Sequence, residues 1–368
     1  MAWRGFAGVI AGAWLCAGCG IPVSRLPDLP ADAVEAEHRL QQITEMREYY
    51  TQLARVDTVA FRIRVANREF CENVGAQAGM YVATVQSLPR KYRSYANEAL
   101  NLSWTNPTVI SVVANSPAAY AGIKVGDQIQ FLDEDPVPAT ATGGFVAAYL
   151  RSRGEQPVRV ALKRDGVEQA VMMTPVLACA IPINYVPSEI VNAYATESDK
   201  ITIFAGIVAL ARTDAQLAHV IGHELAHANL GHADKKRLNM LLGMAGGLAI
   251  DGGFAIGGIF TDGTFARHLG QAGLMAYSVG FEREADYVGA YYAARAGYDL
   301  TGVEEFWRAM GAVHPDSIRF ATTHPSTPTR FVQVREVAAE IADKKRRHLP
   351  LVPELKFPPE PATADSNY

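Results

Sequence analysis

The stretch His223–Glu224–Leu225–Ala226–His227 decides how this chain is to be read. If it is helical, the two imidazoles lie one turn apart on one face, because positions i and i+4 of an α-helix share a face. Glu224 follows His223 by roughly 100° around the helix, so its carboxylate flanks the same point in space. Two histidines on one face with an acid beside them predict a metal site at which Glu224 polarises a water molecule.

The flanking residues favour that helix. Between Asp214 and Leu230, apolar residues recur at helical spacing; they are Leu217, Val220, Ile221, Leu225 and Ala228. Thr213 or Asp214 is a suitable N-cap, and Gly231 is a suitable end. The motif therefore falls inside a helix, as an H-E-x-x-H zinc site requires.

A catalytic zinc needs a third protein ligand and keeps its fourth position for water. A third histidine six residues after the second is excluded, because that position is Ala233 and the glycine that accompanies it would have to be Leu230. His232 is one residue short of that spacing, and we interpret it as a residue at the C-terminal end of the helix, where the macrodipole favours a cation. His219, one turn before His223, is expected to be a packed neighbour.

A second segment offers the missing ligand. Glu282 and Asp286 are four residues apart and share a helical face. Glu282 would bind the metal, and Asp286 would accept the second ring N–H of a liganding histidine and fix its tautomer. The alternative is an ordinary charged helix face. The apolar flanks Val279 and Val288 favour a half-buried helix instead, in which an acid needs a partner.

Taken together, H-E-L-A-H at 223–227 and F-E-R-E-A-D-Y-V-G at 281–289 resemble the CAAX prenyl endopeptidase family, which includes HtpX-like and BepA-like zinc peptidases. The resemblance runs from about Val186 to about Arg335. It also covers the segments 192–194, 203–208 and 323–330. It implies one Zn²⁺ per chain, Glu282 as the third ligand and Asp286 as a supporting residue.

His324 belongs to the last of those segments. The resemblance implies that it faces the metal, where it would stabilise an oxyanion or block the open position. The alternative is a loop histidine before a helix that begins near Pro328.

The first residues have the pattern of an N-terminal leader sequence. Residues 1–18 are short, apolar and small, as in a signal peptide. Ala17–Gly18 before Cys19 resembles a bacterial lipobox, although Cys16 stands where leucine is usual. We expect a lipid on Cys19, a tether over residues 19–30, and a place in the periplasm at the outer membrane of a Gram-negative cell. The alternative is simple secretion.

The middle of the chain has a different pattern. Residues 115–129 resemble the S-P-A-x-x-A-G-I-x-x-G-D-x-I run of PDZ domains, and 164–166 is a hairpin turn between two strands. We place an inserted PDZ domain at residues 103–176. Such domains bind extended peptides by adding a strand to a sheet edge.

The remaining boundaries follow from that insertion. Residues 31–102 would hold an N-terminal helix, Ala31 to Arg55, and a first strand, Arg55 to Phe70. Residues 177–345 would be the metallopeptidase domain and 346–368 a disordered proline-rich tail. Cys71 and Cys179 bracket the insertion, and an exported protein meets an oxidising compartment, so we expect a disulfide between them.

The segment 238–260 is apolar and glycine-rich but contains Asp251. We expect a helical lid or loop over the site, with a membrane hairpin as the alternative. The formal net charge of −4 argues against nucleic acid as a partner.

The sequence thus predicts an α+β protein: a mainly helical zincin-type domain with a small edge sheet, plus a β-rich PDZ insertion. We expect a zinc endopeptidase of the cell envelope that cleaves unfolded polypeptides held extended along residues 201–208. The alternative is a latent metallopeptidase-fold chaperone or a PDZ adaptor.

Overall fold

A computed structural model describes residue 24 and residues 26–88, 90–138, 143–196, 200–275, 278–313 and 328–354 of the chain. The chain divides into two compact units, Met1–Gln42 and Ile43–Tyr368. Within the first unit the described part is chiefly the beginning of helix α2. Apart from the first residues of α2, the elements described below belong to the second unit.

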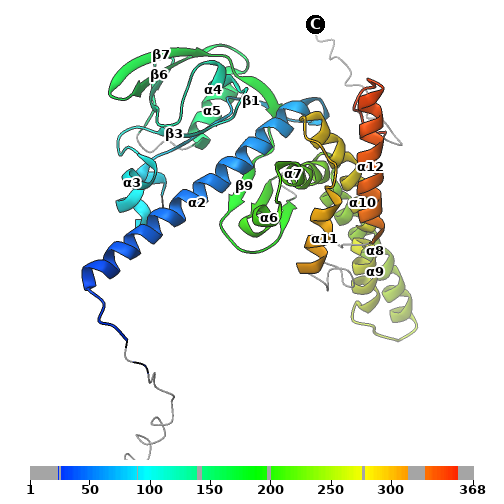
Figure 1. Cartoon of the computed structure of the whole chain (residues 1–368). Helices are drawn as coiled ribbons and strands as arrows, with labels where there is room; N and C mark the ends of the chain where they lie inside the picture. The colour runs from blue at the N-terminus through cyan, green and yellow to red at the C-terminus, as the bar shows by residue number, and fades with distance from the viewer. Residues whose placement is uncertain are drawn as a thin grey trace, which may run out of the picture. The chain divides into compact units, whose positions relative to one another are not determined.

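Helix α2 spans Ala31–Ala66, and a short 3₁₀ helix, η1, follows at Arg68–Phe70 (Figure 1). The predicted strand at 55–70 is therefore wrong. Val56, Val59 and Ile63 recur every three or four residues, and all three are buried, so the helical period overrides the β-branched composition.

The β-rich block contains a sheet with the strand order β2-β3-β4-β6-β7 and β5 paired to β4. The sheet begins at β2, upstream of residue 103. Its elements are β2 Met80–Ala83, β3 Thr108–Val112, α4 Pro117–Tyr120, β4 Gln128–Leu132, β5 Asp135–Pro136, α5 Gly143–Arg153, β6 Val158–Arg164 and β7 Val167–Met173. Between β2 and β3 lie η2 Val85–Ser87, η3 Arg90–Tyr95 and α3 Ala96–Leu100.

The two ends of this block meet. Strand β1, Val74–Gln77, pairs antiparallel with β8, Val176–Cys179. Cys71 and Cys179 form a disulfide with a Cα–Cα distance of 5.6 Å. The adjacent ends are the arrangement expected for a domain inserted into another.

A three-stranded sheet follows, with the order β10-β11-β9. Its strands are β9 Ile183–Val186, β10 Ala193–Ala195 and β11 Ile201–Phe204, and α6 Ala205–Leu210 continues from β11. Strand β11 is the central strand, because it pairs with β10 on one side and with β9 on the other. The prediction of an extended substrate along 201–208 is therefore wrong: the backbone groups of β11 are already paired.

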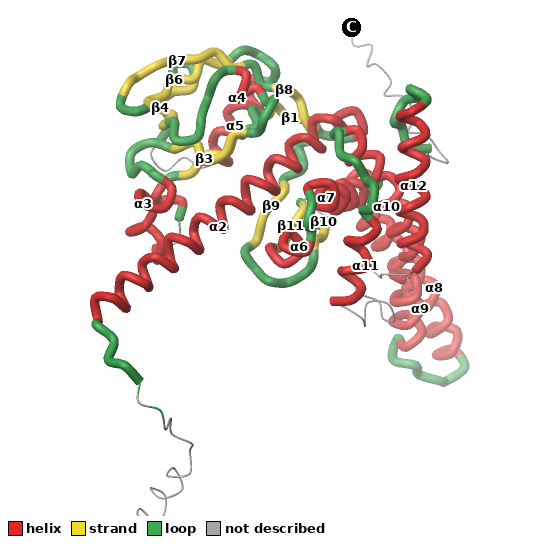
Figure 2. Tube along the Cα trace, in the orientation of Figure 1, coloured by secondary structure: helices red, strands yellow, loops and turns green. Residues whose placement is uncertain are grey.

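Four helices pack into the main core beside this sheet (Figure 2). They are α7 Asp214–Asn229, α10 Ser278–Arg295, α11 Glu304–Val313 and α12 Pro328–Arg346. The core includes Phe306, Trp307 and Met310 from α11. Most of α7 is buried, which fixes its rotation and so the direction of its histidines.

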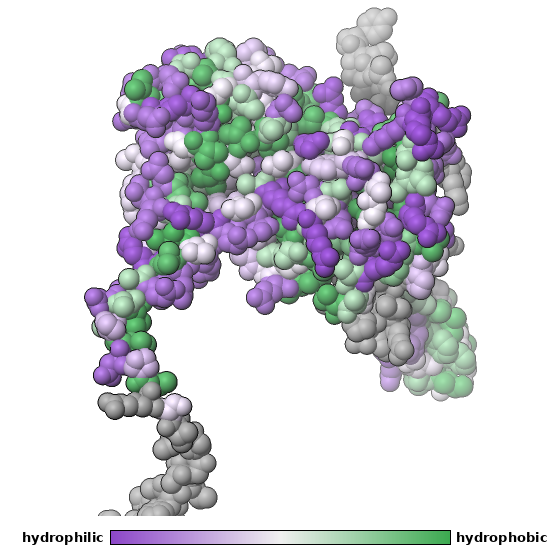
Figure 3. All heavy atoms as spheres, viewed as in Figure 1, coloured by the Kyte–Doolittle hydropathy of each residue, from purple (hydrophilic) through white to green (hydrophobic). Residues whose placement is uncertain are grey.

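Residues 232–275 form a helical hairpin of α8 His232–Ile256 and α9 Thr264–Met275. Asp251 accepts hydrogen bonds from the backbone N–H groups of Phe265 (3.2 Å) and Ala266 (3.0 Å), which lie at the N-terminal end of α9. Among the described residues, α8 is the one helix that is long and apolar enough to cross a membrane. Many of its apolar side chains are exposed, as the green surface at the lower right of Figure 3 shows.

Candidate metal centre

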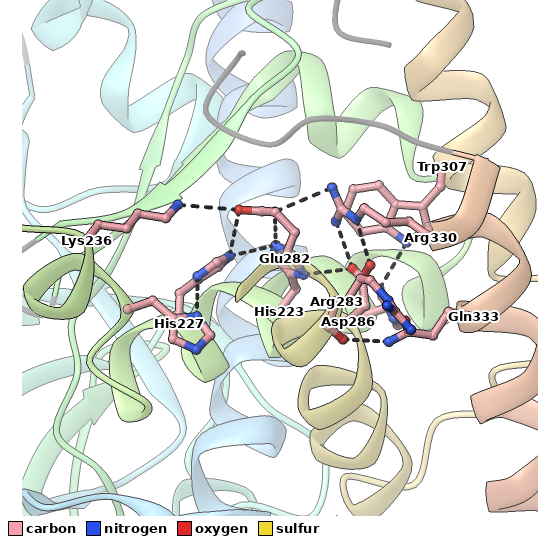
Figure 4. Close-up of polar contacts among 11 residues, drawn as sticks. His223, His227, Lys236, Glu282, Arg283, Asp286, Trp307, Arg330 and Gln333 are labelled. Atoms are coloured by element: carbon pink, nitrogen blue, oxygen red, sulfur yellow. Dashed lines mark hydrogen bonds and ion pairs between the residues drawn. The ribbon is translucent and has the colours of Figure 1, made fainter. Parts of the chain in front are cut away.

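Helix α7 carries the H-E-x-x-H motif in the geometry that its spacing predicts. The side chain of Thr213 accepts a hydrogen bond from the backbone N–H of Gln216 (3.2 Å) and so caps the helix. His223, Glu224 and His227 are all buried. The two imidazole Nε2 atoms lie 3.0 Å apart, so both rings are directed at one point (Figure 4).

Two glycines bring α10 against this helix. A Cβ on Gly222 would lie 2.5 Å from the carbonyl oxygen of Gly289, and a Cβ on Gly289 would lie 2.5 Å from the backbone nitrogen of His223. Both distances are impossible for real side chains, so the backbones touch only because both residues are glycine. The contact places the first turns of α10 beside the histidines.

Glu282 of α10 completes the group. Its carboxylate oxygens lie 3.4 Å from His223 Nε2 and 3.5 Å from His227 Nε2. The three potential ligand atoms all lie within 4.8 Å of one another, and all three residues are buried. Two imidazole nitrogens and one carboxylate oxygen are a donor set that catalytic zinc sites use.

Asp286 lies one turn further along α10 and contacts the other nitrogen of the first histidine. Its Oδ1 atom is 3.0 Å from His223 Nδ1. Burial alone would raise the pKa of Asp286, but the charge and hydrogen bonds of Arg330 hold it well below its usual range. Asp286 therefore stays ionised close to Nδ1 of His223, which favours the proton on Nδ1 and leaves the Nε2 lone pair for a cation.

Arg330, at the start of α12, was not foreseen. It donates two hydrogen bonds to Asp286, from Nε (2.7 Å) and Nη2 (2.8 Å), and its Nη1 lies 3.4 Å from Glu282. Its guanidinium also lies over the ring of Trp307, 4.8 Å from the centroid. Burial opposes the charge, but the carboxylates of Asp286, Glu282 and Glu224 raise the pKa of Arg330. The side chain is 2% exposed and ties α12 to the site.

The charge balance favours a cation at this point. Burial would lower the pKa of His223, yet hydrogen bonds to Asp286 and Glu282 outweigh it and raise the pKa to about 9. Two buried carboxylates thus hold a proton on this imidazole. A divalent cation would replace that proton and satisfy the same carboxylates, because metal binding releases ligand protons.

His232 does not lie at the C-terminal end of α7, so that expectation is wrong. Helix α7 ends at Asn229, Gly231 has a φ of 61°, and His232 is the first residue of α8. Its Nδ1 lies 2.8 Å from His227 Nδ1, and its Nε2 lies 3.1 Å from a carboxylate oxygen of Glu284. Burial and the neighbouring His227 lower the pKa of His232 to about 3.

Two further residues flank the centre. Lys236 of α8 places Nζ 3.7 Å from Glu282, which no spacing in the sequence indicated. His219 is fully buried and accepts a hydrogen bond at Nδ1 from the indole N–H of Trp307 (3.3 Å). Burial lowers the pKa of His219 to about 4, so this ring is neutral, as a packed neighbour should be.

His324 and Cys19 lie outside the described residues, and their predicted roles stay predictions. The structure thus brings together His223, His227, Glu282 and Asp286. It adds Arg330, His232 and Lys236. The histidine five residues after the motif, His232, was visible in the sequence, but its contact required the left-handed turn at Gly231.

Models of two known families match separate parts of the chain. The model of peptidase family M48 matches residues 179–338, and a PDZ domain model matches residues 79–174. Residues 179–338 are therefore similar to peptidase family M48, and residues 79–174 are similar to a PDZ domain.

Two curated proteins and one solved structure are similar to parts of this chain. The mitochondrial metalloendopeptidase OMA1 of Schizosaccharomyces pombe is 27% identical over 158 residues, which are 42% of this chain and 45% of that protein. A putative beta-barrel assembly-enhancing protease of Vibrio cholerae is 25% identical over 182 residues, which are 45% and 35% of the two chains. The HtrA3 PDZ domain bound to a phage-derived ligand is 18% identical over 28% of this chain and 88% of that one, with a TM-score of 0.23. The chain spans less than half the length of these curated relatives.

Proposed function

We propose that this chain is a zinc-dependent endopeptidase whose metal is held by His223, His227 and Glu282. One observation carries the proposal: two helices that are distant in sequence place three buried donor atoms within 4.8 Å of one another. The donors fit zinc in type and number, since a catalytic zinc takes three protein ligands and leaves one position open. Zinc bound there would lower the pKa of a water molecule and polarise a peptide carbonyl.

Glu224 is the residue we assign to proton transfer. It is 2% exposed and follows the first ligand on α7. In this role its carboxylate takes a proton from the attacking water and later delivers it to the leaving amine. Its negative charge contributes to the raised pKa of Arg330, which supports a place for Glu224 beside the same group of charged residues. His324 remains a proposed neighbour that would stabilise the oxyanion or occupy the open position.

A polypeptide is the substrate class that the surroundings support. Strand β10 is an edge of the three-stranded sheet and packs on α7. An extended chain could add to this edge through backbone hydrogen bonds, because edge strands present unpaired N–H and C=O groups. The PDZ domain would hold a second extended segment of the same kind. We therefore propose unfolded or misassembled proteins as substrates.

The cell envelope is the proposed location. Support comes from the lipobox-like residues before Cys19 and from the similarity to the Vibrio cholerae protease. A lipid on Cys19 would anchor the chain at the periplasmic side of the outer membrane, where it would serve quality control. The rival candidate, a chaperone or peptide-binding adaptor with a latent site, is favoured by the PDZ domain.

The deciding experiment compares Glu224→Gln with the wild-type protein on unfolded casein, with zinc content measured for both. We expect one zinc per chain in each and cleavage only by the wild type. Cleavage that persists in Glu224→Gln overturns the mechanism. Zinc that is retained by Glu282→Ala as tightly as by wild type overturns the ligand set. Wild-type protein that holds zinc but cleaves nothing supports the adaptor.

A further inference from the structure

A chain of three side chains leads away from the metal centre on the side of His227. Nδ1 of His227 lies 2.8 Å from Nδ1 of His232, and Nε2 of His232 lies 3.1 Å from Oε2 of Glu284. Each contact is a hydrogen bond whose direction depends on where the imidazole protons sit. The carboxylate fixes that direction, because an ionised carboxylate can only accept.

The proton positions follow from this constraint. Glu284 accepts a hydrogen bond from the Nε2–H group of His232, which leaves Nδ1 of neutral His232 as an acceptor. Nδ1 of His227 must then be the donor. A neutral His227 with its proton on Nδ1 has a lone pair on Nε2, the atom that faces His223 at 3.0 Å and Glu282 at 3.5 Å.

The opposite arrangement would disable the ligand. If Nδ1 of His232 carried the proton and donated it, neutral His227 would hold its own proton on Nε2. That atom could then not bind a cation, since a metal ligand must be deprotonated at the coordinating nitrogen.

We propose that His232 and Glu284 are positioning residues that select the tautomer of His227 able to bind the metal. The inference rests on the proposed zinc site and assigns it a second support. His223 is oriented directly by a carboxylate, Asp286, whereas His227 is oriented through a neutral imidazole that relays the influence of a more distant carboxylate. The side chain that contacts His227 is thus an imidazole, and the carboxylate of Glu284 lies beyond it.

The surroundings hold the relay in place. Gly231 has left-handed backbone geometry and separates the two helices, so His232 is the first residue of α8 rather than a continuation of α7. The His232 ring stacks on Phe281, with centroids 4.8 Å apart and planes at 26°, and the residue is 1% exposed. Because the His232 ring is shielded from solvent, a water molecule cannot replace its hydrogen bond to His227.

The first test measures zinc affinity by competition with a chelator in three variants. His232→Phe keeps the stacked ring but has no acceptor, and we expect about 10- to 100-fold weaker binding. His232→Asn can place an amide oxygen near the position of Nδ1, and we expect most of the affinity to return. His268→Phe, at an exposed histidine of α9, is the matched control and should bind as wild type does.

Two results would overturn the proposal. Unchanged affinity in His232→Phe means that His227 needs no acceptor. Equal losses in His232→Phe and His232→Asn mean that the residue acts by packing alone.

The second test reads the tautomer directly by ¹⁵N NMR of the histidine side chains in the metal-free protein. We expect the proton of His227 on Nδ1 in the wild type and in Glu284→Gln, whose amide oxygen can still accept. In Glu284→Ala, we expect both tautomers of His232 to be populated, and both tautomers of His227 as a result. A proton on Nε2 of His227 in the wild type overturns the proposal. This readout needs no zinc, so it separates a failed relay from a failed zinc site.

Discussion

Gly222 and Gly289 touch through their backbones, and this contact is what makes one site out of two helices. A Cβ on Gly222 would lie 2.5 Å from the carbonyl oxygen of Gly289. With any larger residue, α10 would have to move away from α7. Glu282 lies on α10, two turns before Gly289. The distance between α7 and α10 therefore sets the distance between the proposed ligands.

Gly289→Ala should therefore damage the site without touching a ligand. Over-packing of a close contact costs about 1–3 kcal/mol, and zinc affinity should fall at least about tenfold, since the added methyl group meets the backbone of His223. Urea unfolding and chelator competition measure the two effects. Gly246→Ala is the matched control, because a Cβ there meets nothing within 4 Å. Equal behaviour of the two variants would show that the helices have room to spare.

Local patterns in the sequence were sufficient for the parts of the site that lie on one helix. The i, i+4 spacing of His223 and His227 needs nothing beyond one turn of α7, and the same holds for Glu282 and Asp286 on α10. The contact between Gly222 and Gly289 was not predictable in this way, because it joins two helices and no periodicity reports it.

The predictions that the structure contradicts likewise fail where the outcome depends on contacts beyond the local sequence. Residues 55–66 contain β-branched side chains, and their composition suggested a strand. Their burial in the core as part of α2 decides for the helix. His232 belongs to α8 and not to α7, because Gly231, with a φ of 61°, separates the two helices. Arg330 was missed because its partners lie on α10, and a pairing between helices leaves no mark in local spacing.

Arg330→Met should destabilise the protein even without metal. The substitution leaves the buried carboxylates of Asp286 and Glu282 without the guanidinium that contacts both, and breaking a buried pair in this way costs about 3–5 kcal/mol. The stability of Arg330→Lys should lie between those of wild type and Arg330→Met, because a lysine keeps the charge but loses the two-point contact. Urea unfolding of the metal-free protein gives the values. Arg335→Met, on the exposed side of the same helix, should change stability by less than about 1 kcal/mol; if it matches Arg330→Met, the buried pairing is not the cause.

Removal of the Cys71–Cys179 disulfide should destabilise the second unit. The bond joins residues 108 positions apart, and closing a loop of that size removes unfolded-state entropy worth about 4–5 kcal/mol in the chain-entropy model. We expect the double variant Cys71→Ala/Cys179→Ala to lose about 2–5 kcal/mol. Dithiothreitol should lower the melting temperature of the wild type towards that of the variant and leave the variant unchanged. An unchanged melting temperature of the wild type in dithiothreitol would contradict a stabilising role of the disulfide.

Asp57 makes the stability depend on pH. Burial raises the pKa of Asp57 to about 6 from 3.8, although the nearby charge of Arg64 works in the other direction. The folded state therefore holds this proton more tightly than the unfolded state does. The resulting stabilisation is complete below pH 3.8 and is lost as the pH rises through 6; the difference corresponds to about 3 kcal/mol.

Asp57→Asn stays neutral at every pH and removes that dependence. Relative to wild type, the variant should gain stability between pH 4 and pH 7, by up to about 3 kcal/mol, and the gain should level off above pH 7. Urea unfolding at half-unit steps of pH measures it. Asp135→Asn, at an exposed aspartate, provides the matched control for the change from carboxylate to amide. A stability difference between Asp57→Asn and wild type that stays constant with pH would mean that the folded protein hydrates this carboxylate as fully as the unfolded chain does.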